Sequence, residues 1–345
     1  GMRVLLLERA VLPSRPAVSC PAIYSPTMRL LDEVGADESD YARGTPRLRR
    51  WVTEVRDDFQ TSNDIPMLHG RDYGYAIDRA RFDDALWRNA ARFDGVTALP
   101  GFAVTDLLWE DGRVVGVRGR RGGEAEQSFR AGCVVGADGR FSLVARKAGA
   151  ETKDEVTSFP TTIYYAYWTN VEPYDDQGPA VHVFGPGYGH GFLLMDSADG
   201  ATCVAVEGQA AILDPGELKP AEFYLNLVRQ HPRLWRRLRN ATQITGVHGM
   251  RNIGNLYRAA GGPGWALVGD ALHQKDPLDG QGIFDALFTA KALAEALGGW
   301  KRGEQTWEQA MAQYDAAVRA ETYPMFLHTL ERVKRDVYGK APEWA

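Results

Sequence analysis

The sequence predicts an α/β fold in which one region holds buried parallel strands and another holds an antiparallel sheet. Two short, unbroken apolar runs, VLLL at residues 4–7 and WALV at residues 265–268, are typical of strands buried on both faces of a parallel sheet. Residues 158–247 are instead rich in β-branched and aromatic side chains, which favours an antiparallel sheet. The length of 345 residues favours two domains.

Local signals place further elements in the first 150 residues. Ser25-Pro26 predicts a helix start with Ser25 as its N-cap, and Asp78 is the expected cap of a second helix. Asp111-Gly112 lies between two strand-like runs and predicts a tight hairpin. Asp138-Gly139 is expected to turn the chain, after which Ser142 begins a helix. The strands of this part therefore form a meander between helices.

The C-terminal half combines the antiparallel sheet with helices. We expect one helix near residues 221–230 within the sheet segment. The buried strand at residues 265–270 then leads through GDALHQKDPLDGQG, residues 269–282, into a helix over residues 281–297. Apolar spacing predicts helices in the tail as well.

Composition narrows the class of protein. The net charge is -5, which gives no electrostatic case for nucleic acid or an anionic membrane surface as partner. The three cysteines are far apart and form no CxxC pair, so a zinc site or a disulfide framework has little support. No apolar stretch approaches the length of a membrane span, and no signal peptide is visible. We expect a cytoplasmic enzyme that binds no metal.

Two segments carry residues suited to a polyol or nucleotide ligand. Glu8 ends the first strand, where an acidic residue of a dinucleotide-binding βαβ unit accepts ribose hydroxyls; a solvated surface residue is the alternative. In residues 269–282, Asp270 suits a polyol chain, and Gly280 and Gly282 let a flat ligand approach the backbone. The amides of the following helix start favour negative charge on that ligand. A plain glycine-rich turn is the alternative there.

Together these segments resemble the FAD-dependent aromatic hydroxylase family, the single-component flavoprotein monooxygenases of the para-hydroxybenzoate hydroxylase type. The resemblance covers nearly the whole chain. It implies a Rossmann-like FAD-binding domain, a substrate-binding antiparallel β-sheet domain and C-terminal helices. The expected boundaries are residues 2–48, 74–157 and 251–300 for the discontinuous FAD-binding domain, 49–73 and 158–250 for the substrate domain, and 301–345 for the helices.

The resemblance also implies the site residues. The residues expected to bind FAD are Glu8, Arg9, Arg79, Val104, Asp138, Gly139, Gly269, Asp270, Pro277, Gly280, Gln281 and Gly282. The aromatic side chains expected to line the substrate site are Tyr165, Tyr167, Trp168, Phe184 and Phe192, with Tyr164 and Tyr188 as further candidates; a role in the core of the sheet is the alternative for each. No side chain is expected to act as a nucleophile. The chain departs from the family pattern at Phe284 and Thr289, where asparagine and aspartate are frequent.

One family motif is not found in the chain. The family begins with a strand and a GxGxxG phosphate loop, and only then reaches the strand that ends in the acidic residue matched by Glu8. We therefore expect the chain to start at the second strand of that unit, to bind FAD weakly or not at all, and to leave one edge of its first strand unpaired. A neighbouring copy that covers this edge would make a homodimer.

The function implied by the resemblance is that of an FAD-dependent monooxygenase that uses NADPH or NADH. It would hydroxylate a small aromatic or apolar substrate through a flavin C4a-hydroperoxide. One alternative is an FAD-dependent reductase of the geranylgeranyl reductase type. Another is a flavin-free, inactive remnant that binds a ligand or partner. A flavin-dependent halogenase shares the fold, but no two tryptophans here have the spacing of its WxWxIP motif.

Overall fold

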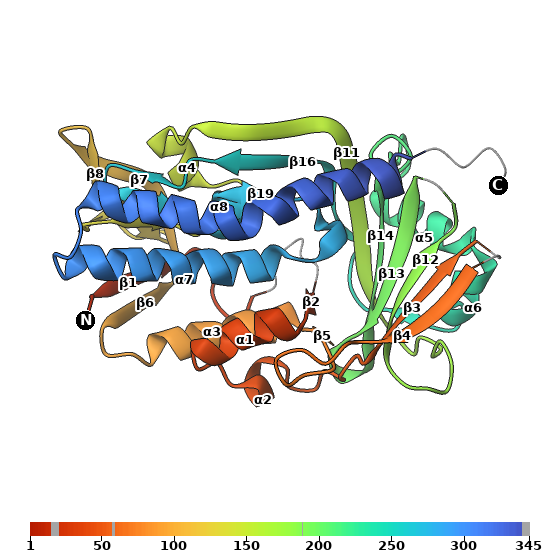
Figure 1. The fold of residues 1–345 in the computed structure, drawn as a ribbon. Helices are drawn as coiled ribbons and strands as arrows, with labels where there is room; N and C mark the ends of the chain where they lie inside the picture. Colours follow the sequence, from red (N-terminus) through yellow and green to blue (C-terminus); the bar gives the residue numbers. More distant parts are fainter. Residues whose placement is uncertain (15–20, 57–58, 188, 340–345) are drawn as a thin grey trace.

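The computed structural model describes residues 1–14, 21–56, 59–187 and 189–339. Two regions are visible in Figure 1. The first, which we call the helix-rich region, holds two long helices, α7 and α8, above several short sheets. The second, which we call the sheet region, is built on a nine-stranded sheet. The strands β11 and β16 run from one region into the other. The predicted mixed α/β fold is therefore confirmed.

The nine-stranded sheet follows the order β19-β16-β11-β14-β13-β12-β3-β4, with β15 paired to β11. All of these pairings are antiparallel except that of β12 with β3. The strands are β3 (Arg50–Val55), β4 (Phe59–Asp64), β11 (Thr152–Thr169), β12 (Ala180–Gly185), β13 (His190–Asp196), β14 (Ala201–Gln209), β15 (Thr242–Gln243), β16 (His248–Arg258) and β19 (His273–Gln274). The antiparallel sheet predicted for residues 158–247 is present, and it recruits β3 and β4 from the N-terminal part.

The two faces of this sheet are covered by different parts of the chain. The helices α5 (Pro220–Arg229) and α6 (Pro232–Leu238) pack on one face, over a core that includes Phe192, Leu194 and Val204. On the opposite face, Val181 and Met195 pack with Ala22 of β2 (Ala22–Ile23) and Ala76 of β5 (Tyr75–Ala76). Because β2 and β5 belong to the N-terminal part of the chain, this opposite face looks toward the helix-rich region.

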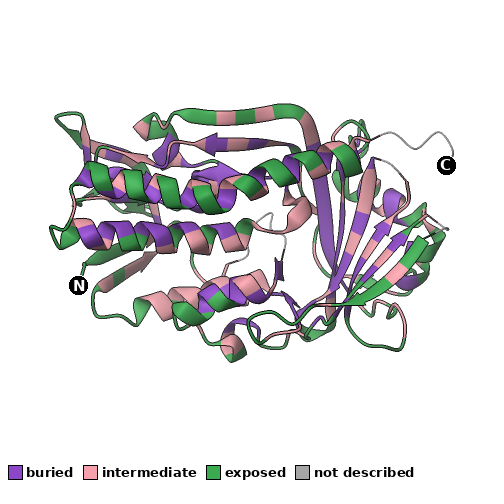
Figure 2. Cartoon of the chain, viewed as in Figure 1, coloured by how far each residue is buried: buried purple, intermediate pink, exposed green. Residues whose placement is uncertain are grey.

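The parallel strands form two small sheets. β1 (Val4–Glu8) pairs with β6 (Val96–Pro100), and β10 (Val134–Gly136) pairs with β18 (Trp265–Leu267). β18 is fully buried, as predicted, and pairs on its other side with β17 (Gly261–Gly262). β1 is not: Val4 and Leu5 are 46% and 37% exposed. The exposure of these side chains shows that the prediction of burial on both faces is wrong for β1 (Figure 2). Among the described residues no strand pairs with its second edge, as expected.

The predicted hairpin is confirmed. β7 (Phe102–Glu110) and β8 (Arg113–Arg121) are joined by Asp111 and Gly112, which both have positive φ angles of 47° and 74°. Two successive left-handed residues match the right-handed twist of the flanking strands. β9 (Gln127–Arg130) adds a third strand to this meander.

Three of the N-terminal helices test the predicted caps. Asp78 caps α3 (Arg79–Ala91) by accepting a hydrogen bond from the Arg81 amide at 3.1 Å, and Ser142 caps α4 (Leu143–Ala148) in the same way. Ser25 is not a cap, because it is already the first residue of α1 (Ser25–Glu33). Its hydroxyl donates instead to the Leu68 carbonyl. A short helix, α2 (Glu38–Tyr41), follows.

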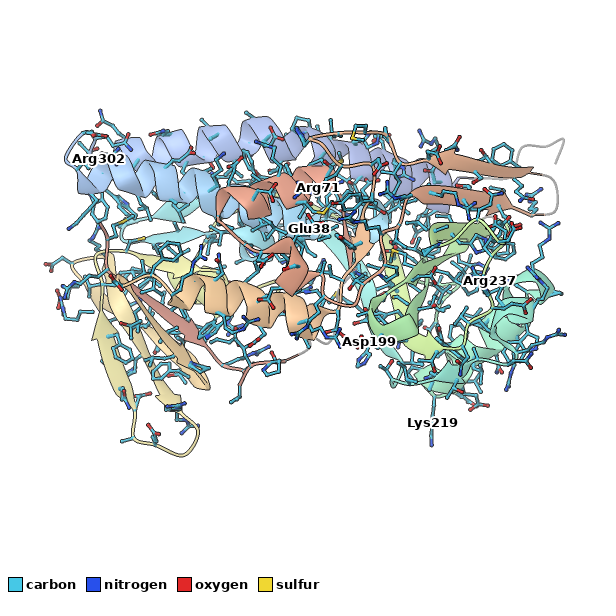
Figure 3. All side chains as sticks on the ribbon, turned by 90° about the horizontal axis from the view of Figure 1, so that it is seen from below. Glu38, Arg71, Asp199, Lys219, Arg237 and Arg302 are labelled. Carbon is cyan, nitrogen blue, oxygen red and sulfur yellow. The ribbon has the colours of Figure 1, made fainter. Side chains whose placement is uncertain are left out.

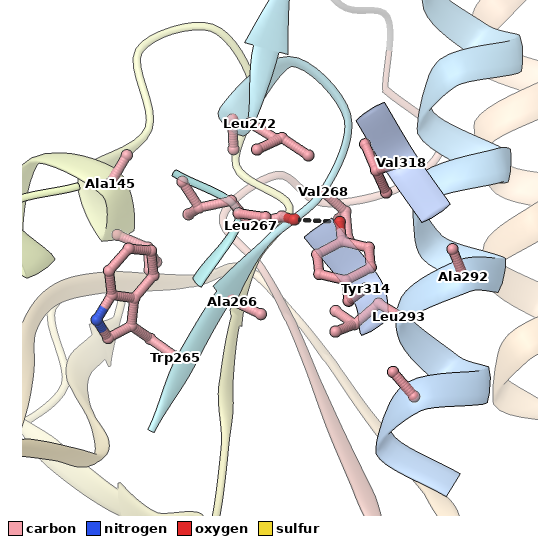
Figure 4. Close-up of a cluster of buried hydrophobic side chains, with 14 of the residues drawn as sticks. Ala145, Trp265, Ala266, Leu267, Val268, Leu272, Ala292, Leu293, Tyr314 and Val318 are labelled. Atoms are coloured by element: carbon pink, nitrogen blue, oxygen red, sulfur yellow. Dashed lines mark hydrogen bonds between the residues drawn. The ribbon is translucent and has the colours of Figure 1, made fainter. Parts of the chain in front are cut away.

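The long helices complete the core of the helix-rich region. α7 (Gly282–Lys301) and α8 (Trp307–Arg332) lie side by side, and α8 continues into a π-helical turn at Val333–Val337. Buried side chains of both helices pack against β18, and the hydroxyl of Tyr314 donates to the Leu267 carbonyl (Figure 4). No helix within the described ranges has the length and apolarity needed to cross a membrane.

Candidate cofactor site

The two predicted motif segments meet at the carboxyl ends of β10 and β18. β10 leads into Asp138-Gly139, and β18 leads into Gly269-Asp270; because these strands are parallel neighbours, the two turns lie at one edge of the sheet. Arg140 and Gln274 join the turns. The Arg140 guanidinium donates to the Gln274 side-chain oxygen at 3.2 Å, and the Gln274 amide donates back to the Arg140 carbonyl at 2.7 Å.

The Asp270 carboxylate, at this edge of the sheet, is free to accept hydrogen bonds. Its half-buried carboxylate makes no hydrogen bond to any described residue. Burial raises its pKa, and the positive charges of Arg140, Arg79 and Lys275 oppose that rise. A Cβ added at Gly282 would lie 4.0 Å from one oxygen of Asp270, so the first turn of α7 faces this carboxylate across the glycine. The arrangement suits a ligand with several hydroxyl groups.

The N-terminus of α7 adds hydrogen-bond donors. Its N-cap residue, Gln281, makes no side-chain cap, and Gly280 before it has a positive φ of 62°. The first amides of an uncapped helix have no partner within the helix, and the helix dipole favours acceptors there. The preceding turn, Pro277–Asp279, is held by Asp276, whose carboxylate accepts from the Leu278 amide at 3.0 Å. These donors are therefore fixed in place.

Thr289 explains one departure from the family pattern. Its hydroxyl accepts a hydrogen bond from the Gly269 amide at 2.9 Å and donates to the Asp285 carbonyl at 2.7 Å. Gly269 has a positive φ of 55°, which favours glycine. Thr289 thus ties the start of the motif loop to α7.

A buried ion pair lies behind the motif loop and was not predicted. The ammonium of Lys275 lies 2.8 Å from a carboxylate oxygen of Asp285 on α7, and the two side chains are 5% and 6% exposed. Burial raises the pKa of Asp285 to about 6, against the opposing charge of Lys275. No spacing rule pairs a loop residue with a helix residue in this way, so the sequence carries no signal for this contact.

His273 is buried at the same loop. Its ring stacks on Tyr257 with centroids 5.0 Å apart, and neither ring nitrogen has a hydrogen-bond partner among the described residues. Burial lowers its pKa to about 3, so the ring is neutral. The ring is therefore an uncharged, flat surface stacked on Tyr257, with one N–H donor and one acceptor nitrogen left without a described partner.

Asp138 is engaged in its own helix. Its carboxylate accepts from the Leu143 and Val144 amides at 2.6 and 3.1 Å, and from the Ser142 hydroxyl. This side chain therefore holds the start of α4. Its neighbour Gly139 has a φ of 76° and open space where a Cβ would be, so the backbone there is accessible.

The other residues predicted to bind FAD lie on separate elements. Glu8 ends β1 and accepts from the Ala10 amide at 2.7 Å, while Arg9 after it is exposed. Arg79 opens α3 and contacts Asp83 at 3.0 Å, and Val104 lies in β7 opposite Gly119. Their roles toward a cofactor stay predictions.

The predicted substrate residues do not share one face of the sheet. Tyr165 and Tyr167 lie on the face toward the helix-rich region, in a cluster with Ile163 and Cys203. The other three, Trp168, Phe184 and Phe192, lie on the opposite face and pack under α5 and α6, as does Tyr164.

Trp168, Phe184 and Phe192 therefore pack in the core under α5 and α6 and do not share a face with Tyr165 and Tyr167. The reason is the alternation of side chains along a strand, which separates Tyr167 from Trp168. The indole N–H of Trp168 also donates a hydrogen bond to the buried Tyr224 hydroxyl, at 3.2 Å. Tyr188 lies outside the described residues.

The residues at this edge fit FAD. An unpartnered carboxylate at Asp270 matches a sugar-alcohol chain, and the amides of the uncapped α7 match a charged or carbonyl group. Gly282 and Gly139 leave the space that a flat or bulky group requires. Asp270, Gly280, Gly282 and Arg140 are the residues we expect to hold it.

The comparisons with known proteins agree with this fit. The family model for the FAD binding domain matches residues 1–321. A digeranylgeranylglycerophospholipid reductase of Methanocella arvoryzae is 29% identical over 254 residues, which cover 73% of this chain and 62% of the relative. Protein FixC of Bradyrhizobium diazoefficiens is 26% identical over 330 residues, covering 88% and 72%. The chain thus spans less than two thirds of the first of these relatives.

Solved structures share the fold. A triple mutant of the flavin-dependent brominase Bmp2 superposes with a TM-score of 0.84 at 19% identity, covering 98% of this chain and 84% of the other. The probable FAD-dependent monooxygenase PqsL of Pseudomonas aeruginosa superposes with a TM-score of 0.72 at 19% identity, covering 95% and 87%. The match of the family model to residues 1–321 shows that the chain belongs to the FAD binding domain family.

Proposed function

We propose that this protein is an FAD-dependent oxidoreductase acting on an apolar organic molecule that lies on the Tyr165 and Tyr167 face of the sheet. One observation carries the proposal. Thr161, which lies on that same face of β11, hydrogen-bonds to Asp276 of the motif loop, and the Asn255 side chain of β16 accepts from the Asp276 amide at 2.8 Å. The cofactor loop is thus anchored on the strand that continues into the apolar face.

The residues of this chain position both partners of the reaction. FAD, when bound, supplies the redox chemistry. The Asp270 carboxylate would accept hydrogen bonds from hydroxyl groups of the bound cofactor, and the first amides of α7 would donate to its acceptors. Thr161 and Asp276 fix the loop relative to β11. No side chain of this site needs to become a covalent intermediate.

The apolar face suits a flat or unsaturated substrate. Tyr165 and Tyr167 lie edge to face with ring centroids 6.2 Å apart, and Ile163 and Ile253 complete a buried cluster. Aromatic surfaces favour offset or edge contacts with other rings.

Two reactions fit this arrangement. The aromatic surface supports hydroxylation of an aromatic or apolar substrate with NADPH or NADH as electron donor. The curated relatives support reduction of a carbon–carbon double bond, since one of them is named a digeranylgeranylglycerophospholipid reductase. Dependence on oxygen separates the two reactions. Hydroxylation consumes O₂ together with NAD(P)H, whereas reduction needs an electron donor but no O₂.

Visible absorbance tests the cofactor. The purified chain is incubated with FAD, desalted and scanned, beside the variant Asp270→Asn and the control Glu304→Gln, an exposed carboxylate paired with Arg302. Without a GxGxxG loop the sequence alone predicts weak FAD binding or none. Because Asp270 and the uncapped start of α7 offer an acceptor and donors for the cofactor, we instead expect retained flavin bands in the unmodified chain and the control. We expect about tenfold weaker FAD binding in Asp270→Asn, as for one lost charge-assisted hydrogen bond. A parent protein that is colourless after FAD treatment contradicts the proposal. NAD(P)H oxidation with and without oxygen then assigns the reaction.

A further inference from the structure

A second polar site lies on the other face of the sheet, under α6. A cavity of about 360 Å³ opens between β3, β12, the segment after β11 and α6. Its lining includes Glu54, Tyr174 and His182, and the arginines 233, 236 and 237. Figure 3 shows Arg237 within the sheet region, at the opposite end of the molecule from Arg302. The sheet separates this cavity from the Tyr165 and Tyr167 face.

The hydrogen bonds in this cavity fix the state of His182. The Arg237 guanidinium lies 2.9 Å from Nδ1 of His182, and a guanidinium has only donors, so Nδ1 accepts. The proton is therefore on Nε2, which donates to Glu54 at 3.0 Å. His182 is a neutral ring between a cation and a carboxylate, and burial together with the Arg237 charge lowers its pKa to about 4.

Arg237 is in direct contact with no carboxylate of the described residues, and the charges of Asp196 and Glu54 act on it only from farther away. The residue is 4% exposed, and its two hydrogen bonds go to neutral acceptors, His182 Nδ1 and the Glu172 carbonyl at 2.8 Å. Among the described residues no carboxylate lies within ion-pair distance of it. A guanidinium carries five N–H donors, so further donors remain available on the side of the cavity. A buried charge without a partner is costly, and an anion in the cavity would offset that cost.

The neighbouring charges do not supply the missing anion. Both Glu54 oxygens are engaged, by His182 on one and by Tyr174 at 3.1 Å on the other. Asp175 is bonded to Arg50 through both of its oxygens, at 2.6 and 3.1 Å. Arg236 lies at the mouth with its side chain 52% exposed, and its contact with Glu172 is long, at 3.4 Å.

We propose that this cavity binds a small organic anion through a phosphate or carboxylate group, with Arg237 as the buried contact and Arg236 at the mouth. A guanidinium fork matches both oxyanions. The cavity is larger than a single oxyanion requires, which leaves room for a small organic body. The site is independent of FAD, because it lies on the other side of the sheet from the motif loop.

Titration of the FAD-free chain tests this site. Inorganic phosphate and acetate are each added while binding is followed by calorimetry and by the ¹⁵N signals of the His182 ring. We expect saturable binding of at least one anion, with a shift of the Nδ1 signal because Arg237 redistributes its hydrogen bonds. Binding of phosphate alone or acetate alone identifies the oxyanion that the site prefers. No saturable binding of either anion overturns the proposal.

Variants locate the binding. Arg237→Gln is expected to abolish it, and Arg236→Gln, at an exposed position that tolerates change, to weaken it about tenfold, as for one charge-assisted hydrogen bond. Arg302→Gln is the matched control, because Arg302 is an exposed arginine paired with Glu304 far from the cavity. Equal affinity in Arg236→Gln and Arg302→Gln, or an unmoved His182 signal, would also overturn the proposal, even if Arg237→Gln failed to fold.

Discussion

The two buried charged clusters of this protein are built differently. In the helix-rich region, Lys275 and Asp285 are in direct contact at 2.8 Å. In the sheet region, a neutral His182 stands between Arg237 and Glu54. The first cluster neutralises itself, whereas the second leaves a cation facing a cavity. Both clusters bury charge, but only the second has a cation without a direct anionic partner, and only there do we propose a ligand site.

The largest effect is expected from breaking the self-neutralising pair. Lys275→Met leaves Asp285 buried without a partner, which costs about 3–5 kcal/mol of the free energy of unfolding. Urea denaturation of the FAD-free chain measures this. The control is Lys291→Met. Lys291 is a half-exposed lysine of α7, the helix that carries Asp285, and it pairs with Glu33, so we expect a loss below about 1 kcal/mol.

The double variant Lys275→Met/Asp285→Asn completes the cycle. Removing both charges together should recover most of the loss, since no unpaired charge stays buried. Equal losses in Lys275→Met and Lys291→Met would show that the buried pair does not behave as a direct ion pair.

Acid is expected to weaken the sheet region through His182. Its pKa in the folded protein is lowered to about 4, against about 6.5 for an unperturbed histidine, so the unfolded chain binds the proton more readily. The stability from neutral His182 is complete above pH 6.5 and is lost as the pH falls toward 4, by on the order of 3 kcal/mol. His273, with a lowered pKa, acts in the same direction. The difference between the parent and His182→Gln, measured by denaturation from pH 7 to pH 4, isolates the first contribution; a pH-independent difference would contradict it.

Asp285 should respond to acid with the opposite sign. Its pKa is raised from 3.8 to about 6, so the folded protein binds this proton more readily than the unfolded chain. The resulting stability is present below pH 3.8 and is lost as the pH rises through 6, by at most about 3 kcal/mol. Asp285→Asn removes a contribution that falls between pH 4 and pH 6, whereas His182→Gln removes one that rises over this range. The two variants should therefore change the pH dependence of the free energy of unfolding in opposite directions. Shifts of the same sign in both variants would contradict the contrast between the clusters.

Local sequence patterns predicted turns and helix caps better than they predicted which strands are buried. The Asp111-Gly112 hairpin and the Asp78 cap depend on neighbouring residues only, and both are confirmed. The unpaired edge of β1 was predicted, but the burial of its side chains was not as predicted, because an apolar run does not reveal whether other elements cover its faces. Ser25 was misplaced by one residue, since α1 begins with it.

The candidate site was predicted in part. The motif residues Gly269, Asp270, Gly280 and Gly282 were named from the sequence, and the structure gathers them with Arg140 at one edge. Side chains alternate between the two faces of β11, so the sequence already places Tyr167 and Trp168 on opposite faces. It does not show which of these faces α5 and α6 cover, because that depends on contacts between residues far apart in the chain. Lys275 and Asp285 meet only through the fold of the motif loop.

One long strand pair also has a mechanical consequence. β11 covers 18 residues, from the edge of the helix-rich region into the middle of the nine-stranded sheet, and β16 follows it along both parts (Figure 1). Because these two hydrogen-bonded strands run through both regions, a change in the angle between the regions requires the strands to bend. The ladder between β11 and β16 is irregular from Val156 to Thr161. Any bending of this pair would meet the fewest ladder hydrogen bonds in this segment, beside the threonine that anchors the motif loop.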